Sequence, residues 1–329
     1  MSNAAIDQIL GRNDAIEGVR KLVRKAAVSP ARTILIYGET GTGKGLVARV
    51  IHELSPRGAG PFVDINCAAI PAELLESELF GFERGAFTGA SQKKIGLVEA
   101  ADKGTLFLDE IRELSPVLQA KLLTVMDTQR FRRVGSVTPI SVDVRFVAAT
   151  NRILLSEVRE GRFREDLYYR LQVIAINLPP LRERGDDILL LARHFLAELC
   201  QRYGRAPMAI SEEVGEIFRL YRWPGNVREM QNLLERIVAL EEADSVERAH
   251  LPARVLRSLS EPKTQLPLPA GSDFHAATEN FQRELLGRAL VAHAGNVHGA
   301  ATALGLTRHA LRHQLKKLGL DPSSFTGKS

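Results

Sequence analysis

A glycine-rich segment between an apolar run and a helical pattern constrains the fold of this chain most strongly. The β-branched run 33–37 stops at Gly38-Glu39-Thr40-Gly41-Thr42-Gly43-Lys44, and apolar residues then recur at helical spacing from Leu46 to Leu54. In a strand, loop and helix, the pattern GxxxxGK places backbone N–H groups and a helix N-terminus around phosphates, with Lys44 reaching the terminal ones. The segment therefore predicts a nucleotide-binding α/β domain. Gly45 stands where a hydroxyl often contacts Mg²⁺, so other ligands or water must hold that metal.

Three further apolar runs end in polar side chains. The runs 61–65, 105–108 and 144–149 lead to Asn66, to Asp109-Glu110 and to Thr150-Asn151, respectively. Buried parallel strands are near-continuous apolar runs, and in open α/β sheets ligands bind outside the carboxyl ends of the strands. We therefore expect these polar ends to gather around the same phosphates as the glycine loop, although each alone could be a turn or a helix cap.

Phosphoryl transfer gives each of these side chains a role. We expect Asp109 to hold Mg²⁺ directly or through water, and Glu110 to orient and deprotonate the attacking water. Asn151 would sense or polarise the terminal phosphate. Asn66 could hydrogen-bond to Glu110 and restrain it.

Several arginines are candidates for stabilising charge on the transferred phosphoryl group, a task that a neighbouring subunit often performs. Arg164 and Arg170 offer this chemistry, although surface arginines mostly solvate a face. Arg228 lies in the first turn of the helix predicted after the turn 223–226. A cation is unfavourable there unless an anion lies nearby, which makes Arg228 a candidate phosphate contact in a lid.

The hexapeptide Gly85-Ala86-Phe87-Thr88-Gly89-Ala90 carries one aromatic and one hydroxyl side chain between small residues. Because glycine adopts φ > 0 without steric cost, the segment can form a pliable tip that holds Phe87 toward a partner. An ordinary turn with Phe87 folded inward fits this hexapeptide alone equally well.

The C-terminal tail carries most of the net charge. From residue 276 to 329, seven Lys and Arg residues stand against three acidic ones, so four of the net +5 charges lie there. Three helical patterns follow, with Gly305 at the tight turn between the last two and Thr307 as the predicted cap of the third. Their apolar positions are Phe281, Leu285, Leu286, Ala289 and Leu290, then Val297, Ala300, Ala301 and Leu304, then Leu306, Leu311, Leu315 and Leu318.

The third of these helices has a basic outer face, which suits phosphates and base edges of double-stranded DNA. A charged helix face is more often only solvated, but the helix-turn-helix pattern and the tail's charge favour DNA binding. The predicted DNA-contacting residues are Thr307, Arg308, His309, Arg312, His313 and Lys316.

These motifs together resemble the AAA+ domain of bacterial enhancer-binding proteins, the sigma-54-dependent transcription activators. The resemblance covers residues from about 8 to 246, and the GAFTGA segment is specific to that family among AAA+ proteins. The tail resembles the Fis-type helix-turn-helix that ends many members of the family. The matching segments are 38–44, Asn66, 78–81, 85–90, 106–110, 163–170, 178–184 and 223–229.

The resemblance implies an ATP-driven homo-oligomer, from a dimer to a hexameric ring, that remodels the closed complex of the sigma-54 RNA polymerase holoenzyme. It implies ATP binding by residues 38–45 and hydrolysis by Asp109 and Glu110, with Asn66 as the switch partner of Glu110. Phe87 and Thr88 would contact sigma-54.

By the same resemblance, Arg164 and Arg170 are fingers acting on the next subunit, and Arg228 is the sensor of the lid. Two-fold pairing of the tails would favour palindromic half-sites in enhancer DNA. Gly45 and Phe82 depart from the usual family pattern, and neither change removes an essential group.

The expected architecture is an α/β AAA+ P-loop ATPase with a parallel sheet, a helical lid subdomain and an all-α C-terminal helix-turn-helix domain. The expected bounds are 8–177 for the nucleotide-binding subdomain, 178–246 for the lid, 247–275 for a linker and 276–321 for the DNA-binding domain. No apolar run is long enough to span a bilayer and the start lacks a secretory signal, so we expect a cytoplasmic protein without a membrane partner.

Two other functions remain open. An AAA+ unfoldase or loader would use Phe87 to grip a polypeptide in a pore, and a DNA-binding repressor would only sense nucleotide. The tail and the GAFTGA segment favour the activator over the unfoldase. Glu110 and the paired arginines have no role in a repressor that does not hydrolyse nucleotide.

Overall fold

The structure is a computed structural model of the chain, and it describes residues 4–260, 274–293 and 295–322. Contacts divide the chain into two compact units, Met1–Ser260 and Glu261–Ser329. Across the described residues, no helix combines the length and the apolar character that crossing a membrane requires.

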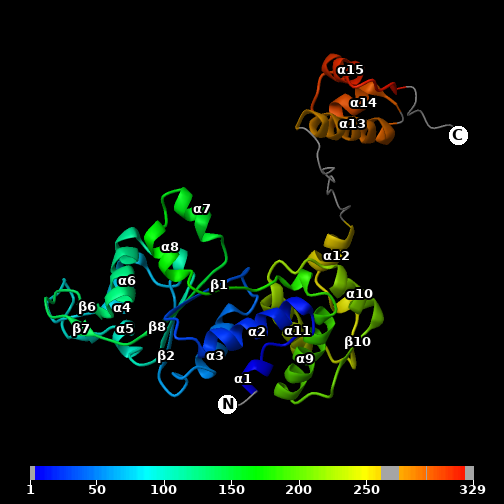
Figure 1. Cartoon of the computed structure of the whole chain (residues 1–329). Coiled ribbons are helices and arrows are strands. Elements are labelled where there is room, and N and C mark those ends of the chain that lie inside the picture. Colours follow the sequence, from blue (N-terminus) through cyan, green and yellow to red (C-terminus); the bar gives the residue numbers. More distant parts are fainter. Residues whose placement is uncertain (1–3, 261–273, 294, 323–329) are drawn as a thin grey trace. The chain divides into compact units, whose positions relative to one another are not determined.

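Five parallel strands form the sheet of the first unit, in the order β2-β5-β8-β1-β9. Figure 1 labels three of them, β2, β8 and β1. The parallel sheet predicted from the apolar runs is confirmed, and β9 is a strand that the sequence analysis missed. The register places Asn66 opposite Asp109 and Tyr37 opposite Thr150, so the polar strand ends lie along one edge. The strands are β1 Thr33–Tyr37, β2 Phe62–Asn66, β5 Thr105–Asp109, β8 Arg145–Thr150 and β9 Ala175–Asn177.

The sheet separates two hydrophobic cores because successive strand residues point to opposite faces. Leu35 packs into one core while Ile34 and Ile36 pack into the other, and the same alternation places Phe146 and Val147 on opposite faces. The core of Ile34 is covered by α1 Ala4–Asp7, α2 Asp14–Val28 and α3 Lys44–Glu53. The core of Leu35 is covered by α4 Ala72–Phe80, α5 Leu97–Ala100, α6 Pro116–Thr128, α7 Leu154–Arg159 and α8 Glu165–Leu171.

Two short antiparallel hairpins and a 3₁₀ turn complete this α/β subdomain. The strands β3 Gly81–Phe82 and β4 Lys94–Ile95 pair at the base of the segment that contains residues 85–90. The strands β6 Arg130–Phe131 and β7 Ile140–Ser141 form the second hairpin. The 3₁₀ turn η1, Ile111–Glu113, directly follows β5 and Glu110.

The remainder of the first unit is a helical lid built around Trp223. This side chain is fully buried, its Nε1 donates a hydrogen bond of 2.8 Å to the Phe218 carbonyl, and the rings of Phe218 and Tyr221 pack edge-on against it. The lid comprises η2 Leu181–Glu183, α9 Asp187–Arg202, β10 Ala209–Ile210, α10 Glu212–Leu220, α11 Asn226–Leu240, β11 Ser245–Val246, η3 Arg248–His250 and α12 Ala253–Ser260.

The segment predicted as a linker, 247–275, begins with ordered structure that belongs to the lid. It contains η3 and α12, and Leu251 and Val255 are buried in the lid core because their apolar side chains lie on one side of this segment. Residues 261–273 lie outside the described residues.

The second unit is a three-helix domain with α13 Phe274–Ala292, α14 Val297–Ala303 and α15 Arg308–Lys317. Thr307 caps α15 by accepting a hydrogen bond of 3.2 Å from Ala310 N, and Gly305 has φ +65°, both as the turn pattern requires. Leu285 and Leu306, predicted to be apolar contacts, are 42% and 39% exposed, and the side chain of Phe281 lies outside the described ones. The buried core is Leu286, Leu290, Ala300, Ala301, Leu311, Leu315 and Leu318.

Candidate active site

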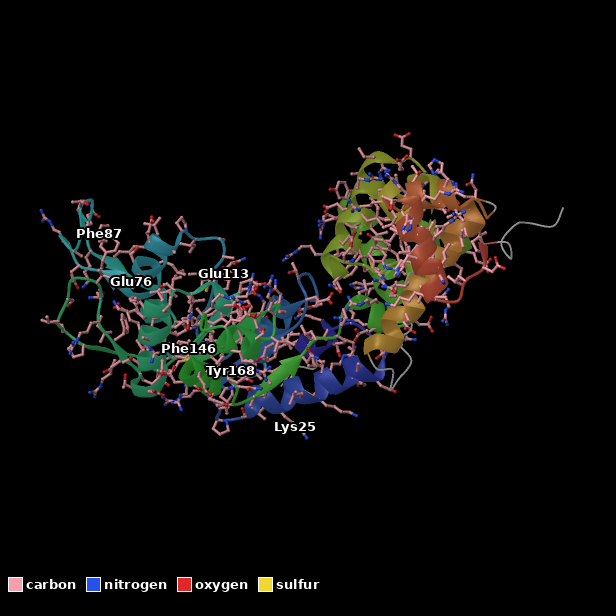
Figure 2. The ribbon with its side chains drawn as sticks, turned by 90° about the horizontal axis from the view of Figure 1, so that it is seen from above. Lys25, Glu76, Phe87, Glu113, Phe146 and Tyr168 are labelled. Carbon is pink, nitrogen blue, oxygen red and sulfur yellow. The ribbon has the colours of Figure 1, made fainter. Side chains whose placement is uncertain are left out.

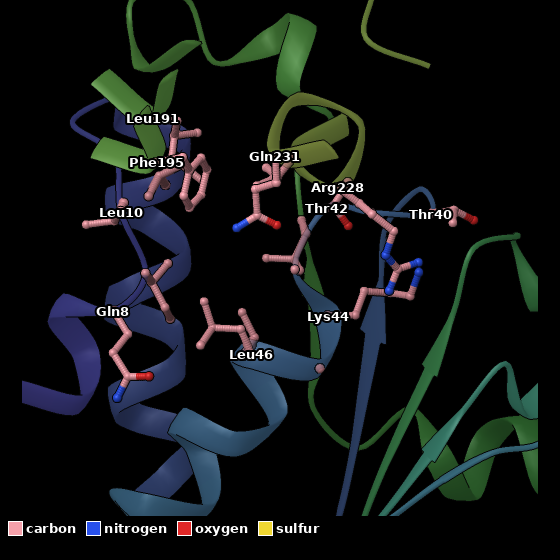
Figure 3. Close-up of a pocket in the computed structure, with 18 of the residues that line it drawn as sticks. Gln8, Leu10, Thr40, Thr42, Lys44, Leu46, Leu191, Phe195, Arg228 and Gln231 are labelled. Carbon is pink, nitrogen blue, oxygen red and sulfur yellow. The ribbon is translucent and has the colours of Figure 1, made fainter. Parts of the chain in front are cut away.

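A cavity of about 1050 Å³ lies between the carboxyl edge of the sheet and the lid. The glycine loop, the strand ends at Asn66 and Asp109-Glu110, and the lid residue Arg228 supply its polar lining. The rest of its lining mixes apolar side chains, such as Leu10, Leu191 and Phe195, with polar ones, such as Gln8 and Gln231. Figure 3 shows Lys44 and Arg228 on one side of the cavity, with Leu10 and Phe195 on the other. The cavity therefore has a cationic end and, opposite it, an end where apolar side chains lie among polar ones.

Lys44 is the first residue of α3 and lies at the cationic end. Its ammonium donates hydrogen bonds to the carbonyls of Gly38 at 2.9 Å and Glu39 at 3.3 Å, and its Nζ is 3.9 Å from Glu110 Oε1. Burial lowers the pKa of Lys44, whereas the carboxylates of Glu110 and Asp109 act in the opposite direction. The carbonyls of the glycine loop thus fix the position of the Lys44 ammonium at the cavity.

The acidic pair at the end of β5 has an unusual backbone. Asp109 Oδ1 accepts a hydrogen bond of 3.0 Å from the Glu110 backbone N–H. Glu110 has φ 50° and ψ 50°, a left-handed conformation that is costly for a residue with a Cβ and that clusters at functional sites. Glu110 Oε2 is buried and has no hydrogen-bond partner among the described residues. A strained backbone and an unsatisfied carboxylate oxygen thus coincide at Glu110.

The two asparagines at the strand ends have different surroundings. Asn66 Oδ1 accepts a hydrogen bond of 2.9 Å from Ala68 N, and the recorded ion pairs of Glu110 are instead with Lys44 and Arg112. Asn151 Nδ2 donates to Thr40 Oγ1 at 3.2 Å, while its Oδ1 is buried without a partner among the described residues. Among the described residues, no hydrogen bond joins Asn66 to Glu110, whereas Asn151 lies against the glycine loop.

Arg164 and Arg170 lie outside the cavity. Arg164 pairs with Asp166, with Nη2 2.7 Å from Oδ2, and Arg170 pairs with Asp127, with Nε 2.9 Å from Oδ1. Both side chains are more than 40% exposed. Arg228, by contrast, lines the cavity, and its backbone N–H donates to the Gly41 carbonyl at 3.3 Å.

Lid residues whose role the sequence analysis missed hold the glycine loop. Arg182 pairs with both carboxylate oxygens of Glu39 at 2.7 and 2.8 Å. Asn226, fully buried, donates to Glu39 Oε2 at 3.1 Å and to the Thr40 carbonyl at 3.0 Å. Arg184 Nη2 donates to the Thr42 carbonyl at 3.1 Å, and its burial lowers the pKa of Arg184 to about 10. The lid is therefore bonded directly to the loop.

Gly41 provides a test of this contact. Its φ is +81°, and a Cβ built there would lie 2.2 Å from the Gly225 carbonyl oxygen, so Gly41→Ala must push the lid away from the loop. Gly43 has φ +102°, but a Cβ there would meet nothing within 4 Å. In both alanine variants, the left-handed backbone lowers the free energy of unfolding by about 1–2 kcal/mol. Only in Gly41→Ala does the clash with Gly225 lower it further. Urea unfolding should therefore show greater destabilisation for Gly41→Ala, and equal losses would contradict this contact.

The 85–90 segment forms a closed loop with Phe87 near its tip. Gly85 N donates to the Ala90 carbonyl at 2.8 Å, and Gly85 and Gly89 have φ +81° and +104°. The Phe87 side chain is 44% exposed, and its ring lies edge-on to Phe82 with centroids 4.9 Å apart. Phe87 is thus neither folded fully inward nor free of the chain, because one edge of its ring rests on Phe82.

The loop after β6, residues 132–139, supports the 85–90 loop, which the sequence did not indicate. Val134 N donates to the Gly81 carbonyl at 2.9 Å, and Glu83 N donates to the Val134 carbonyl at 3.1 Å. Arg133 is only 11% exposed and pairs with Glu83 and Glu99, each at 2.7 Å. These contacts hold the base of the 85–90 loop and leave its tip exposed.

In the second unit, α15 presents a basic surface. The six predicted DNA-contacting residues, Thr307, Arg308, His309, Arg312, His313 and Lys316, are all exposed, while Leu311 and Leu315 of the same helix are buried. The helix thus keeps its apolar face in the core and its cationic face in solvent.

The parallel sheet, the glycine loop with Lys44, the acidic pair at the end of β5 and the helical lid define a P-loop ATPase domain of the AAA+ class. Family models match three successive parts of the chain: the Sigma-54 interaction domain over residues 9–177, the AAA+ ATPase lid domain over 182–267, and the bacterial regulatory protein, Fis family, over 277–318. The chain therefore belongs to the sigma-54 interaction domain family and ends in a Fis-family helix-turn-helix.

Relatives and solved structures agree with this assignment. The nitrogen fixation protein AnfA of Azotobacter vinelandii is 42% identical over 97% of this chain and 58% of its own length. The regulatory protein AtoC of Escherichia coli K12 is 42% identical over 96% of this chain and 68% of its own length. The formate hydrogenlyase transcriptional activator FhlA of Escherichia coli K12 is 47% identical over 97% of this chain and 45% of its own length.

The chain thus spans between 45% and 68% of the length of these three relatives. Among solved structures, NtrX from Brucella abortus in complex with ATP is 33% identical with a TM-score of 0.69, over 95% of this chain and 69% of NtrX.

Proposed function

We propose that this chain is a sigma-54-dependent transcriptional activator. It binds enhancer DNA through α15, assembles from a dimer into a hexameric ring in the cytoplasm, and hydrolyses ATP to remodel the closed complex of the sigma-54 RNA polymerase holoenzyme. The nucleotide-binding subdomain occupies residues 8–177, the lid starts at 178 and includes α12, and the DNA-binding domain occupies 276–321. The observation that carries the proposal is that one compact unit holds both the cavity lined by the glycine loop and the acidic pair and an exposed aromatic loop.

The cavity suits ATP in size and polarity. Small-molecule sites typically enclose a few hundred to about 1000 Å³, and this cavity encloses about 1050 Å³. Lys44, Arg228 and the N-terminus of α3 favour the phosphates, whereas Leu10, Leu191 and Phe195 favour an apolar base. The contacts of Asn151 and Arg184 to the glycine loop keep its backbone in place.

Asp109 and Glu110 account for hydrolysis. Mg²⁺ in nucleotide sites is held by one or two carboxylates together with water and substrate phosphates, and no group of three or more acidic, His or Cys side chains suited to a metal occurs among the described residues. Asp109 fits this role, in which the metal neutralises charge on the phosphates. Glu110 lines the same cavity and turns its Oε1 toward Lys44 on the phosphate side, which suits a base that accepts a proton from water.

The positions of the arginines support assembly. Arg164 and Arg170 are exposed and lie outside their own chain's cavity, so they can act on phosphates only in a neighbouring copy. Because such arginines stabilise charge that develops during transfer, hydrolysis should require an assembled ring. Asn151 and Arg228 would sense the terminal phosphate from within the same chain.

The chain connects the cavity to the 85–90 loop by a short route. Asn66 ends β2 at the cavity, and the chain then passes through α4 directly into β3 and the loop. A shift of Asn66 that follows hydrolysis would therefore reach Phe87 and Thr88 through one helix. In this account, the loop pushes on sigma-54 when nucleotide turns over.

In vitro transcription from a sigma-54 promoter that carries an enhancer tests this function. The activator and the polymerase are first incubated with ATP or with a non-hydrolysable analogue, and all four nucleotides are then added together with heparin, so that only open complexes already formed make RNA. We expect transcripts after incubation with ATP and none after incubation with the analogue, because binding alone does not supply the work of remodelling. Equal transcript yields with the analogue, or no dependence on this protein, would contradict the proposal.

A further inference from the structure

Arg112 lies directly behind the carboxylate of Glu110. It is the middle residue of η1, the 3₁₀ turn that begins immediately after the left-handed backbone of Glu110. Arg112 Nε is 3.7 Å from Glu110 Oε2, and Arg112 Nη2 is 2.7 Å from Glu113 Oε1. The sharp turn at Glu110 thus folds the chain so that a guanidinium returns to the carboxylate two residues earlier.

The two facing atoms of the Arg112–Glu110 ion pair both lack a hydrogen bond among the described residues. These atoms are Arg112 Nε and Glu110 Oε2, and both are buried. Their separation of 3.7 Å is within ion-pair reach but longer than the 2.7–3.2 Å of a hydrogen bond. Buried polar groups rarely remain unsatisfied without a reason, so this contact should tighten during the reaction.

The other carboxylate oxygen faces the opposite way. Glu110 Oε1 is turned toward Lys44 Nζ at 3.9 Å, on the phosphate side of the cavity. Arg112 itself is not among the described residues that line the cavity. One carboxylate is therefore held between a cation on the substrate side and a cation behind it.

We propose that Arg112 is a positioning residue for Glu110, an inference that rests on the proposed hydrolysis of ATP. The planar, permanently charged guanidinium holds Oε2, and Glu113 anchors the guanidinium in turn. This fixes the plane of the carboxylate and leaves Oε1 aimed at the water that attacks the terminal phosphate. Asn66 does not do this in the observed arrangement, because Glu110 Oε2 has no hydrogen-bond partner among the described residues.

If Arg112 positions Glu110, its removal should slow ATP turnover without weakening nucleotide binding. A base displaced by about 1 Å loses on the order of 10²-fold in rate, so Arg112→Ala should lower kcat by about 10- to 100-fold. KM for ATP and the Kd of a fluorescent ADP analogue should stay within about twofold, because Arg112 does not line the cavity. Arg112→Lys keeps the charge but not the planar geometry and should recover part of the lost kcat.

Arg57→Ala is the matched control. Arg57 pairs with Asp143, with Nη2 2.8 Å from Oδ1, and lies outside the cavity, so its loss should leave kcat and KM unchanged. If Arg112→Ala is poorly folded, Glu113→Gln removes only the negative charge that anchors the guanidinium and should lower kcat by a smaller factor at unchanged KM.

The inference is overturned if Arg112→Ala hydrolyses ATP at or above the wild-type kcat, or if its kcat loss comes with equally weakened ADP binding. It is also overturned if Arg112→Lys is no better than Arg112→Ala. If the proposed function were wrong, the wild-type protein itself would not hydrolyse ATP. The role of Arg112 is measured separately, as the ratio of the variant's kcat to the wild-type kcat.

Discussion

Glu110→Gln is expected to stop ATP turnover while leaving ATP binding intact, with kcat lower by about 10²- to 10⁴-fold. Glutamine has nearly the same shape as glutamate and keeps a carbonyl oxygen, but it cannot accept the proton of the attacking water. Binding should be equal or tighter, because the change removes a negative charge beside the site of the phosphates. Phosphate release and the affinity for a fluorescent nucleotide measure the two quantities separately.

Glu53→Gln is the control for this variant, because Glu53 is an exposed carboxylate at the end of α3. It should leave both turnover and binding unchanged. Rapid hydrolysis by Glu110→Gln would show that another group activates the water, and lost binding would show that Glu110 acts chiefly in holding nucleotide.

Phe87→Ala is expected to have the opposite phenotype, with turnover kept and partner binding lost. The ring is 44% exposed and rests on Phe82, and Figure 2 shows Phe87 at the extremity of the α/β subdomain, away from Glu113 at the edge where the acidic pair lies. Truncating an aromatic anchor of an interface typically costs at least about 2 kcal/mol, or roughly 30-fold in affinity. Sigma-54 binding should therefore fall by this factor, while ATPase activity stays within about twofold.

Leu220→Ala serves as the matched control, because Leu220 is a large apolar side chain that is 63% exposed at the end of α10 in the lid. Its removal should affect neither ATPase activity nor sigma-54 binding. Undiminished binding of sigma-54 by Phe87→Ala would place the partner surface elsewhere on the molecule.

Local sequence patterns predicted the centre of the fold. The run 33–37, the glycine loop and the helix after Lys44 were readable because strand, turn and helix each leave a short-range signature. The polar ends of three further runs indicated where the site would lie, because parallel strands share one carboxyl edge. The same reasoning predicted α15, whose cap at Thr307 and apolar spacing are also local features.

The parts that the sequence did not reveal depend on contacts between distant segments. β9 has only three residues and is defined by its pairing with β1. Asn226 was interpreted as part of a turn, but its amide reaches Glu39 and Thr40, which are nearly 190 residues away along the chain. Arg112 is not part of a recognisable sequence motif. The left-handed backbone at Glu110 brings the Arg112 guanidinium to the Glu110 carboxylate, and the sequence does not reveal this conformation.

The predicted linker illustrates a different limit. Three of its four prolines lie at 262, 267 and 269, whereas the stretch before these three forms η3 and α12. Val255 is 1% exposed in the lid core, and it was not recognised because an eight-residue helix carries too few apolar positions to establish a period. Composition alone therefore placed the end of the lid too early.

Promoter melting measured with three proteins side by side tests the central claim, that ATP turnover drives Phe87 against sigma-54. Permanganate reactivity of a sigma-54 promoter should show an open complex with wild-type protein and ATP. It should show none with Glu110→Gln, which binds ATP without hydrolysing it, and none with Phe87→Ala, which hydrolyses ATP without contacting the partner. Melting by Phe87→Ala to the wild-type extent would contradict the account.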